Sequence, residues 1–283
     1  MILFKRKEDL IKWLEGQREN NRTIGFVPTM GALHPGHISL IQSAKKENAI
    51  VVCSIFVNPT QFNDTSDYEK YPITIEDDIL LLEQNGCNVL FLPSISEIYP
   101  DGTSKRTHYD LGHLESILEG KFRPGHFQGV CTVVDRLLRI INPENLYLGQ
   151  KDYQQCMVIN KLVELTGMSE NIKIHVCPTL REDDGLAMSS RNRRLDATQR
   201  SVAPTIYNCL TYIKEKIEPG NIEHLIKETN TKLLKKGFKP DYIEVVDAIT
   251  LKPVRKWDAE QKIVGLIAAF LGEIRLIDNM PLN

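Results

Sequence analysis

The sequence lacks the cysteine patterns by which several classes of protein are recognised. Its 283 residues include six cysteines and no Cys-x-x-Cys pair, which argues against a zinc finger and against a redox motif. Several of the cysteines lie in apolar runs such as 50–56. We therefore expect buried thiols in a reducing compartment and no zinc site.

Long hydrophobic runs and an excess of one charge are missing as well. The longest apolar run, 263–272, is far shorter than the roughly 20 residues that span a bilayer, and the first ten residues are too highly charged for a secretory signal. With 35 basic and 37 acidic residues the formal net charge is -2, which favours neither nucleic acid nor an anionic membrane as a partner. We expect a cytoplasmic enzyme that acts on small molecules.

The patterns that are present predict two domains of different class. Up to about residue 176, apolar or β-rich runs alternate with helical patterns, which is typical of a doubly wound parallel sheet covered on both faces. Strands are expected at 23–27, 49–57, 88–92, 145–148 and 172–176. Two helices, near 197–217 and 222–236, then precede strand-like runs at 242–247, 263–269 and 273–277. The sequence thus predicts a Rossmann-like α/β domain at 1–176 and a smaller α+β domain at 177–283.

The stretch Pro28–His37 carries two histidines three positions apart, in the order Pro-Thr-Met-Gly-Ala-Leu-His-Pro-Gly-His. It lies between a β-rich run and a run with helical spacing, so His37 is expected at or near a helix N-terminus. Such a terminus favours phosphate, and Gly31 and Gly36 allow a ligand to approach the backbone. No Gly-Lys-Ser/Thr follows, so this is not a Walker loop. For these residues alone, a surface turn that happens to hold two histidines is the alternative.

Two further polar stretches follow predicted strands. Phe56–Phe62 contains Gln61, whose amide can donate to a carboxylate and accept from an amine. In Gly149–Gln155, Gly-Gln-Lys-Asp-Tyr-Gln-Gln, Lys151 supplies a point charge suited to a polyphosphate, while Gln154 and Gln155 extend the polar lining. A solvated Asn-Pro turn and a capped helix with exposed polar residues are the respective alternatives.

Other polar groups are less specific. In Leu186–Asn192, two hydroxyls and a guanidinium can bind phosphate oxygens as charge develops on them, and a solvated loop is the alternative. In the polar cluster Arg123–His126, Arg123 is compatible with contact to substrate or phosphate and with an ordinary surface position. Asp77 and Asp78 project about 100° apart on a predicted helix, so they cannot both face one ion without help from a loop.

Taken together, the stretches 28–37, 56–62, 149–155 and 188–192 closely resemble, in this order and at these separations, the pantothenate synthetases (pantoate beta-alanine ligases) of the HIGH-motif nucleotidyl-transfer superfamily. The resemblance implies a Rossmann-like domain that binds ATP and pantoate, a smaller domain that acts as a lid, a homodimer, and ATP with Mg²⁺. It implies a ligase reaction in two steps. Pantoate attacks the α-phosphorus of ATP to give pantoyl adenylate and pyrophosphate, and β-alanine then displaces AMP to give pantothenate.

The resemblance also implies roles for individual residues. His37 and His34 match the proton-donating and phosphate-contacting histidines of the motif, while Lys151 and Arg191 match groups that hold the triphosphate and the developing charge. The ATP-binding residues implied are Met30, Gly31, Ala32, Leu33, His34, Pro35, Gly36, His37, Gly149, Gln150, Lys151, Asp152, Leu180, Met188, Ser189, Ser190 and Arg191.

For the organic substrates, the resemblance implies that Gln61 and Gln155 hold pantoate and that Gln61 also lies where β-alanine enters. Asp77 and Asp78 align near positions linked to Mg²⁺ in some members. Because Leu81 stands where a third polar partner is needed, no protein metal site is predicted, and Mg²⁺ is expected on the ATP phosphates.

Three other interpretations are compatible with parts of the sequence. A different HIGH-motif nucleotidylyltransferase leaves 58–62 and Gln155 unexplained. A small aminoacyl-tRNA synthetase requires a basic surface for tRNA, which a net charge of -2 does not favour. A catalytically silent nucleotide-binding protein would keep the same groups as the enzyme, because binding and catalysis share them.

Overall fold

The structure, a computed structural model, describes residues 1–63, 65–104 and 107–283. Contacts between Cα atoms divide the chain into two compact units, the first of residues 1–150 and 154–178 and the second of residues 151–153 and 179–283. The short segment 151–153 thus groups with the second unit, although the residues before and after it belong to the first. The predicted boundary at residue 176, and the role of the second part as a lid, stay predictions.

The first unit is built on a six-stranded sheet in which every pairing is parallel. Its strands lie in the order β1-β4-β3-β2-β5-β6. They are β1 (Ile2–Phe4), β2 (Ile24–Thr29), β3 (Ile50–Ile55), β4 (Val89–Phe91), β5 (Asn145–Gly149) and β6 (Lys173–Cys177). The predicted doubly wound parallel sheet is therefore confirmed. Strand β1 was not predicted, since three residues give no readable pattern.

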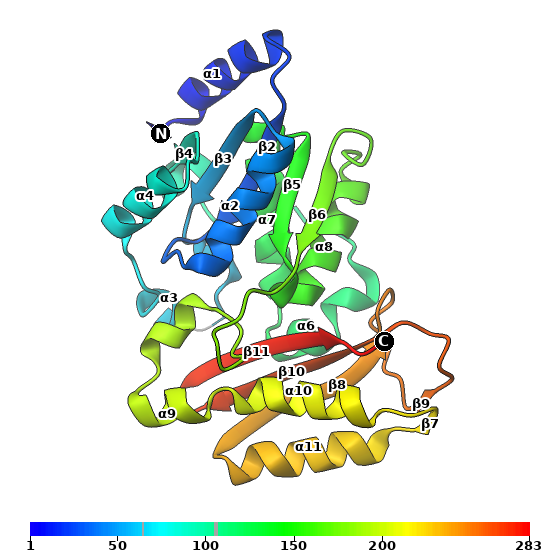
Figure 1. Cartoon of the computed structure of the whole chain (residues 1–283). Coiled ribbons are helices and arrows are strands. Elements are labelled where there is room, and N and C mark those ends of the chain that lie inside the picture. The colour runs from blue at the N-terminus through cyan, green and yellow to red at the C-terminus, as the bar shows by residue number, and fades with distance from the viewer. Residues whose placement is uncertain (64, 105–106) are drawn as a thin grey trace. The chain divides into compact units, whose positions relative to one another are not determined.

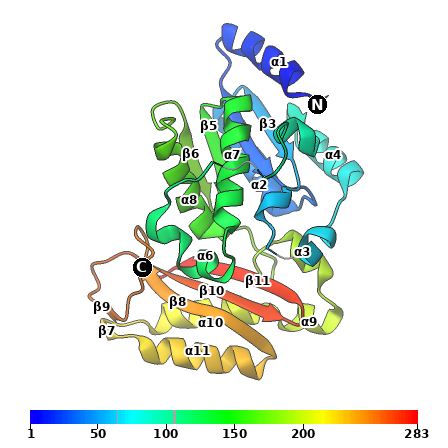
Figure 2. The ribbon, with the colours of Figure 1, turned by 180° about the vertical axis from the view of Figure 1, so that it is seen from behind.

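Helices cover both faces of this sheet (Figures 1 and 2). Helix α2 (Pro35–Glu47) packs on β2, β3 and β5, while α7 (His126–Ile141) lies on the opposite face and contacts α1 (Lys7–Glu19). Every residue of β3 is buried, as expected for a strand covered on both faces. The other helical segments are η1 (Pro59–Gln61), α3 (Thr65–Glu69), α4 (Ile75–Gln84), α5 (Ile95–Ile98), η2 (Gly112–Glu115), α6 (Leu118–Phe122), η3 (Gln150–Asp152) and α8 (Tyr153–Leu165).

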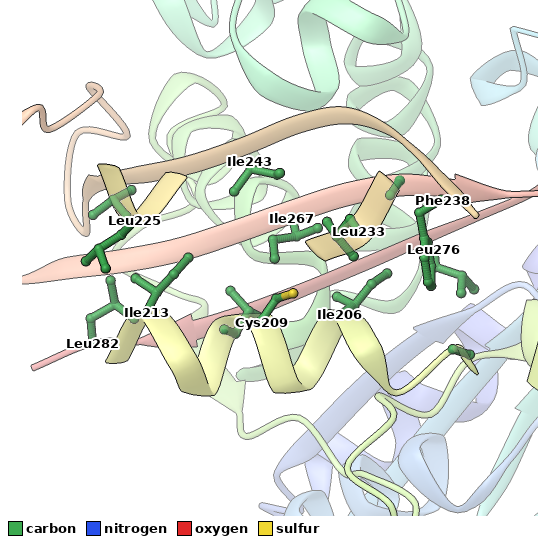
Figure 3. Packing of buried hydrophobic residues seen from close by; sticks show 14 of the residues in the cluster. Ile206, Cys209, Ile213, Leu225, Leu233, Phe238, Ile243, Ile267, Leu276 and Leu282 are labelled. Carbon is green, nitrogen blue, oxygen red and sulfur yellow. The ribbon is translucent and has the colours of Figure 1, made fainter. Parts of the chain in front are cut away.

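The second unit contains a three-stranded antiparallel sheet in the order β11-β10-β8. Figure 3 shows Ile206, Cys209 and Ile213 of one helix directed toward this sheet, where they join a buried cluster with Ile267 and Leu276. The elements are η4 (Ser190–Arg194), α9 (Ala197–Val202), α10 (Thr205–Lys216), β7 (Gly220–Asn221), α11 (Glu223–Lys235), β8 (Phe238–Asp247), β9 (Lys256–Trp257), β10 (Ile263–Leu271) and β11 (Ile274–Pro281). The predicted smaller α+β domain is confirmed.

Two details of the prediction can be checked at single residues. The one helix expected over 197–217 is wrong, because the chain forms two helices, α9 and α10, on either side of Ala203 and Pro204. Proline has no N–H to continue the α9 ladder, which explains the break.

All six cysteines are free and buried, which confirms the prediction of buried thiols. None of the helices in the described ranges has the length and apolar composition needed to cross a bilayer.

The first turn of α7 packs directly on η1, and this contact depends on a glycine. A Cβ atom at Gly129 would lie 2.2 Å from the carbonyl oxygen of Thr60, whereas a Cβ at Gly16 in α1 would meet nothing within 4 Å. We expect Gly129→Ala to lower the free energy of unfolding by about 1–3 kcal/mol, the usual cost of overpacking. Gly16→Ala, the matched control, should raise it by about 0.5–1 kcal/mol because alanine has the higher helix propensity. Urea unfolding followed by circular dichroism measures both changes, and equal stabilities for the two variants would contradict this account.

Candidate active site

Two histidines organise the loop between β2 and α2. His34 is the N-cap of α2, and His37 occupies the third position of the helix, so the predicted helix start is confirmed. Nδ1 of His34 accepts a hydrogen bond from the Gly36 N–H at 3.1 Å, and Nδ1 of His37 accepts from the His34 N–H at 3.3 Å. Such backbone donors require a lone pair on each Nδ1, so a neutral ring carries its proton on Nε2.

The two imidazoles are therefore arranged as a pair of donors. Their ring centroids lie 4.0 Å apart, and each ring presents an Nε2–H group. Both stand in the first turn of α2, where the helix dipole and the backbone N–H groups also favour an anion. The loop is thus suited to phosphate oxygens. The alternative of a surface turn with two incidental histidines does not account for this reciprocal capping.

The buried carboxylate of Asp78 bonds the backbone of the same loop. Gly31 and Ala32 have positive φ angles of 82° and 48°, and for alanine that conformation is unfavourable. Asp78 of α4 is 1% exposed and accepts hydrogen bonds from the N–H groups of Ala32 at 2.9 Å and Leu33 at 2.7 Å. Thr74 donates a third bond to it at 3.1 Å. Asp78 therefore stabilises the strained loop.

This arrangement bears on the two acidic residues considered for Mg²⁺. Both carboxylate oxygens of Asp78 are engaged by protein donors, while Asp77, the next residue along α4, is exposed. The two side chains face different surroundings, as their angular separation predicts. Across residues 1–63, 65–104 and 107–283, no three His, Cys, Asp or Glu side chains are grouped to hold a metal ion.

Gln61, after β3, is a buried residue rather than a solvated one. Its side chain is held at both ends, since Oε1 accepts from Asn58 at 3.1 Å and Nε2 lies 3.1 Å from the sulfur of Met30. Gln61 is 8% exposed and Asn58 1%. The structure therefore brings the loop after β3 next to the loop after β2, and the alternative of a solvated Asn-Pro turn is wrong.

The two adjacent glutamines of α8 have different environments. Gln154 is 3% exposed, and its amide bonds the backbone of Glu119 at 2.9 Å, Leu114 at 2.8 Å and Ile117 at 3.0 Å. The expectation that Gln154 extends the polar lining is wrong, because these main-chain partners use its donors and its acceptor. Gln155, at the next position of the helix, is half-buried.

The strand order of the sheet explains why the loops after β2, β3 and β5 are close together. Strands β3, β2 and β5 are neighbours, so the loops at their carboxyl ends lie along one edge of the sheet. The strand order reverses between β2 and β5, since the chain proceeds from β2 to β3 and β4 on one side and from β5 to β6 on the other. Open parallel sheets bind ligands at such a reversal. Gly149 ends β5 at that point, and Gln150 follows it.

In the second unit, Lys151 is fixed through its main chain. Its carbonyl oxygen accepts from the side chain of Asn279 at 2.9 Å, and its Nζ lies 3.7 Å from Oδ1 of Asp152. Asp278, next to Asn279, forms an ion pair with Arg181 at 2.6 Å and 3.0 Å. Burial raises the pKa of the Asp278 carboxyl, and the Arg181 guanidinium opposes that shift. The neighbouring residues Asp278 and Asn279 thus bond Arg181 and the main chain of Lys151 respectively.

Arg181 and Ala187 pair across a short hairpin, and Ser189 and Ser190 follow it in the chain. Arg181 pairs with Ala187, and the Met188 N–H donates to Leu180 at 3.0 Å, so Leu180 and Met188 are neighbours. Ser189 then caps η4 by accepting from the Arg191 N–H at 3.3 Å. Ser190 is 6% exposed. Hydrogen bonds thereby position the main chain of Lys151, Leu180 and Met188, and the Ser189 side chain positions that of Arg191.

The candidate residues therefore form two groups, one in each unit. The first holds Met30, Gly31, Ala32, Leu33, His34, Pro35, Gly36, His37, Gln61, Gly149, Gln150 and Gln155. The second holds Lys151, Asp152, Leu180, Met188, Ser189, Ser190 and Arg191. Within the first group the structure adds a supporting role for Asn58, which bonds Gln61, and for Asp78, which bonds the loop at 32–33; the sequence motifs assigned neither role.

Comparison with known proteins decides the family. Residues 2–281 match the family model described as pantoate-beta-alanine ligase. A pantothenate synthetase of Cytophaga hutchinsonii is 44% identical over 285 residues, which cover 99% of each chain. The chain belongs to the pantoate-beta-alanine ligase family. A pantoate--beta-alanine ligase of Schizosaccharomyces pombe is 42% identical over 99% of this chain and 98% of its own.

Solved structures of the pantoate-beta-alanine ligase family share the fold. Pantothenate synthetase from Thermus thermophilus matches with a TM-score of 0.91 and 39% identity, over 100% of this chain and 99% of its own. The ligase from Francisella tularensis, complexed with beta-gamma ATP and beta-alanine, matches with a TM-score of 0.80 and 43% identity, over 100% and 98%. The family and the ligase class predicted from the four motifs are confirmed.

The support given by Asp78 can be tested against its neighbour. We expect Asp78→Asn to lower the free energy of unfolding by about 1–3 kcal/mol, because an amide offers one acceptor oxygen to two buried N–H groups and leaves one unsatisfied. Asp77→Asn, on the same turn of α4 but exposed, should change it by less than about 0.5 kcal/mol. Urea midpoints of the two variants and the wild type provide the measurement. A stable Asp78→Asn protein would remove this carboxylate as a support of the loop.

Proposed function

We propose that this chain condenses (R)-pantoate with β-alanine to give pantothenate, with pantoyl adenylate as the intermediate and AMP and pyrophosphate as the other products. The observation that carries the proposal is the family match over residues 2–281. The donor pair of His34 and His37 at the N-terminus of α2 supports it, since the first step concentrates negative charge on phosphate. The Francisella tularensis relative was solved with beta-gamma ATP and beta-alanine, which supports two of the substrates.

In the first step, a carboxylate oxygen of pantoate attacks the α-phosphorus of ATP, and the bond to the bridging oxygen of pyrophosphate breaks. Both reactants are anionic, so catalysis depends on neutralising charge and aligning the groups, and alignment alone can supply about 7–11 kcal/mol. His37 and His34 donate through Nε2–H to the phosphate oxygens. Lys151 and Arg191 stabilise the triphosphate and the departing pyrophosphate together with Ser189 and Ser190.

Mg²⁺ is bound mainly through the ATP phosphates in this proposal. The occupied carboxylate of Asp78 fits that arrangement better than direct coordination by the protein. The ion would neutralise phosphate charge as pyrophosphate leaves. Gly31 and Gly36 let the nucleotide approach the backbone of the loop.

Gln61 and Gln155 hold pantoate, and Gln61 also contacts β-alanine. The buried amide of Gln61 can accept from an amine and donate to a carboxylate. In the second step the amine of β-alanine attacks the acyl carbon of the adenylate, the carbon–oxygen bond to phosphate breaks, and AMP leaves. No protein nucleophile takes part.

The organisation of the enzyme is also a proposal. The second unit acts as a lid on the nucleotide, and two chains form a homodimer in the cytoplasm. A net charge of -2 supports small molecules rather than nucleic acid as partners.

An isotope-exchange assay tests the two-step reaction. Purified protein with ATP, Mg²⁺ and labelled pyrophosphate should return label to ATP only when pantoate is present, because the adenylate must form and reverse. Pantothenate and AMP should appear only after β-alanine is added. Exchange that does not need pantoate, or no product with all three substrates, would overturn the proposal.

The roles of the charged and donor groups can be tested by substitution. His37→Ala and Lys151→Ala should each lower kcat by about 100-fold or more, the usual loss for one transition-state donor. His224→Ala on α11 and Lys161→Ala on α8 remove exposed or half-buried residues outside the two groups and serve as controls with unchanged turnover. Turnover of either test variant near the wild-type value would remove that residue from the mechanism.

A further inference from the structure

His126 is a buried titratable residue for which the proposed mechanism gives no role. It is the first residue of α7 and is 5% exposed. Its Nδ1 lies 2.7 Å from the carbonyl oxygen of Gln61, and its Nε2 lies 3.1 Å from Nη1 of Arg123. Both ring nitrogens are thus in hydrogen-bond contact with the protein.

The two partners fix the protonation state of this ring. A carbonyl oxygen can only accept, so Nδ1 must carry a proton. A guanidinium can only donate, so Nε2 must offer its lone pair. The only form of the imidazole that satisfies both is the neutral Nδ1–H tautomer. It is the opposite of the tautomer that the backbone donors select for His34 and His37.

Arg123 is itself held in place. Its Nη1 lies 3.8 Å from Oε2 of Glu119, and both side chains are largely buried, with exposures of 23% and 11%. The backbone N–H of Glu119 donates to Gln154 of α8 at 2.9 Å. A continuous series of contacts therefore runs from α8 through Glu119 and Arg123 to His126 and ends at the main chain of Gln61.

The same turn of α7 holds the Gln61 loop at a second point. The carbonyl oxygen of Gly129 accepts from the Asn58 amide at 3.1 Å, and that amide also donates to Oε1 of Gln61 at 3.1 Å. The main chain of Gln61 is thus fixed by His126, and its side chain is fixed through Asn58. Together these contacts determine where the Gln61 amide lies.

We propose that His126 is a positioning residue for the organic acid: as a neutral Nδ1–H donor to the Gln61 carbonyl, held by Arg123, it places the Gln61 amide for pantoate. The inference rests on the proposed function, in which Gln61 binds pantoate. His126 acts through Gln61 and does not itself touch the reacting atoms. It answers the question that the Arg123–His126 cluster left open in the sequence.

Three variants test this role by steady-state kinetics. His126→Ala should raise the KM for pantoate by about tenfold or more, because the buried carbonyl of Gln61 loses its donor, while the KM for ATP should change less than about twofold. His126→Asn places an amide N–H near the position of Nδ1 and should bring the KM for pantoate back to within about threefold of the wild type. Gln61→Ala provides the reference for losing the amide itself.

The outcomes separate this inference from the function on which it rests. If Gln61→Ala raises the KM for pantoate and His126→Ala does not, the positioning role is wrong and the proposed function stands. If Gln61→Ala leaves that KM unchanged, the role of Gln61 in the proposed function is wrong, and this inference falls with it. A loss in His126→Asn as large as in His126→Ala, or an equal rise in the KM for ATP, would also overturn the positioning role.

The protonation state gives a readout that does not depend on activity. In the ¹⁵N-labelled wild-type protein near neutral pH, long-range proton–nitrogen correlation should show His126 with a protonated Nδ1 and an unprotonated Nε2. Observation of the Nε2–H tautomer or of an imidazolium would overturn the inference, even if His126→Ala fails to fold.

Discussion

The loop that carries His34 and His37 depends on the hydrogen bonds that Asp78 accepts from the N–H groups of Ala32 and Leu33. Residues 31 and 32 have positive φ angles, and a backbone held this way needs compensation elsewhere. A carboxylate supplies it because its two oxygens accept from two successive N–H groups at once. His34, two residues after Ala32, has the extended conformation of an N-cap. The start of α2 at this point places the His34 and His37 side chains together in the first turn of the helix.

Sequence patterns predicted the parts of this arrangement that depend on neighbours along the chain. The alternation of strands and helices predicted the parallel sheet, and the spacing after Pro28–His37 predicted the start of α2. Both are local, since helix caps and strand periods are set within a few residues. The motifs taken together also indicated the family.

The parts that escaped prediction join residues far apart in sequence. Asp78 contacts the loop at 32–33 from more than forty positions away, and Gln154 bonds the backbone near Glu119. The sequence around one residue of such a contact does not indicate which distant residue is its partner. For the same reason the sequence could not distinguish Gln154, whose amide is bonded to main-chain groups, from Gln155 beside it. Nor could it predict whether His126 lies at the surface or in the interior.

The contact between Gly129 and Thr60 also limits how the enzyme could be redesigned. Helix α7 approaches the η1 turn so closely that a methyl group does not fit between them, and Asn58 and His126 bond across the same contact. Under the proposed function, this turn presents the amide that recognises the acid. To admit a larger acid, a protein engineer would therefore need to enlarge the pocket at other side chains and leave this turn and its helix unaltered.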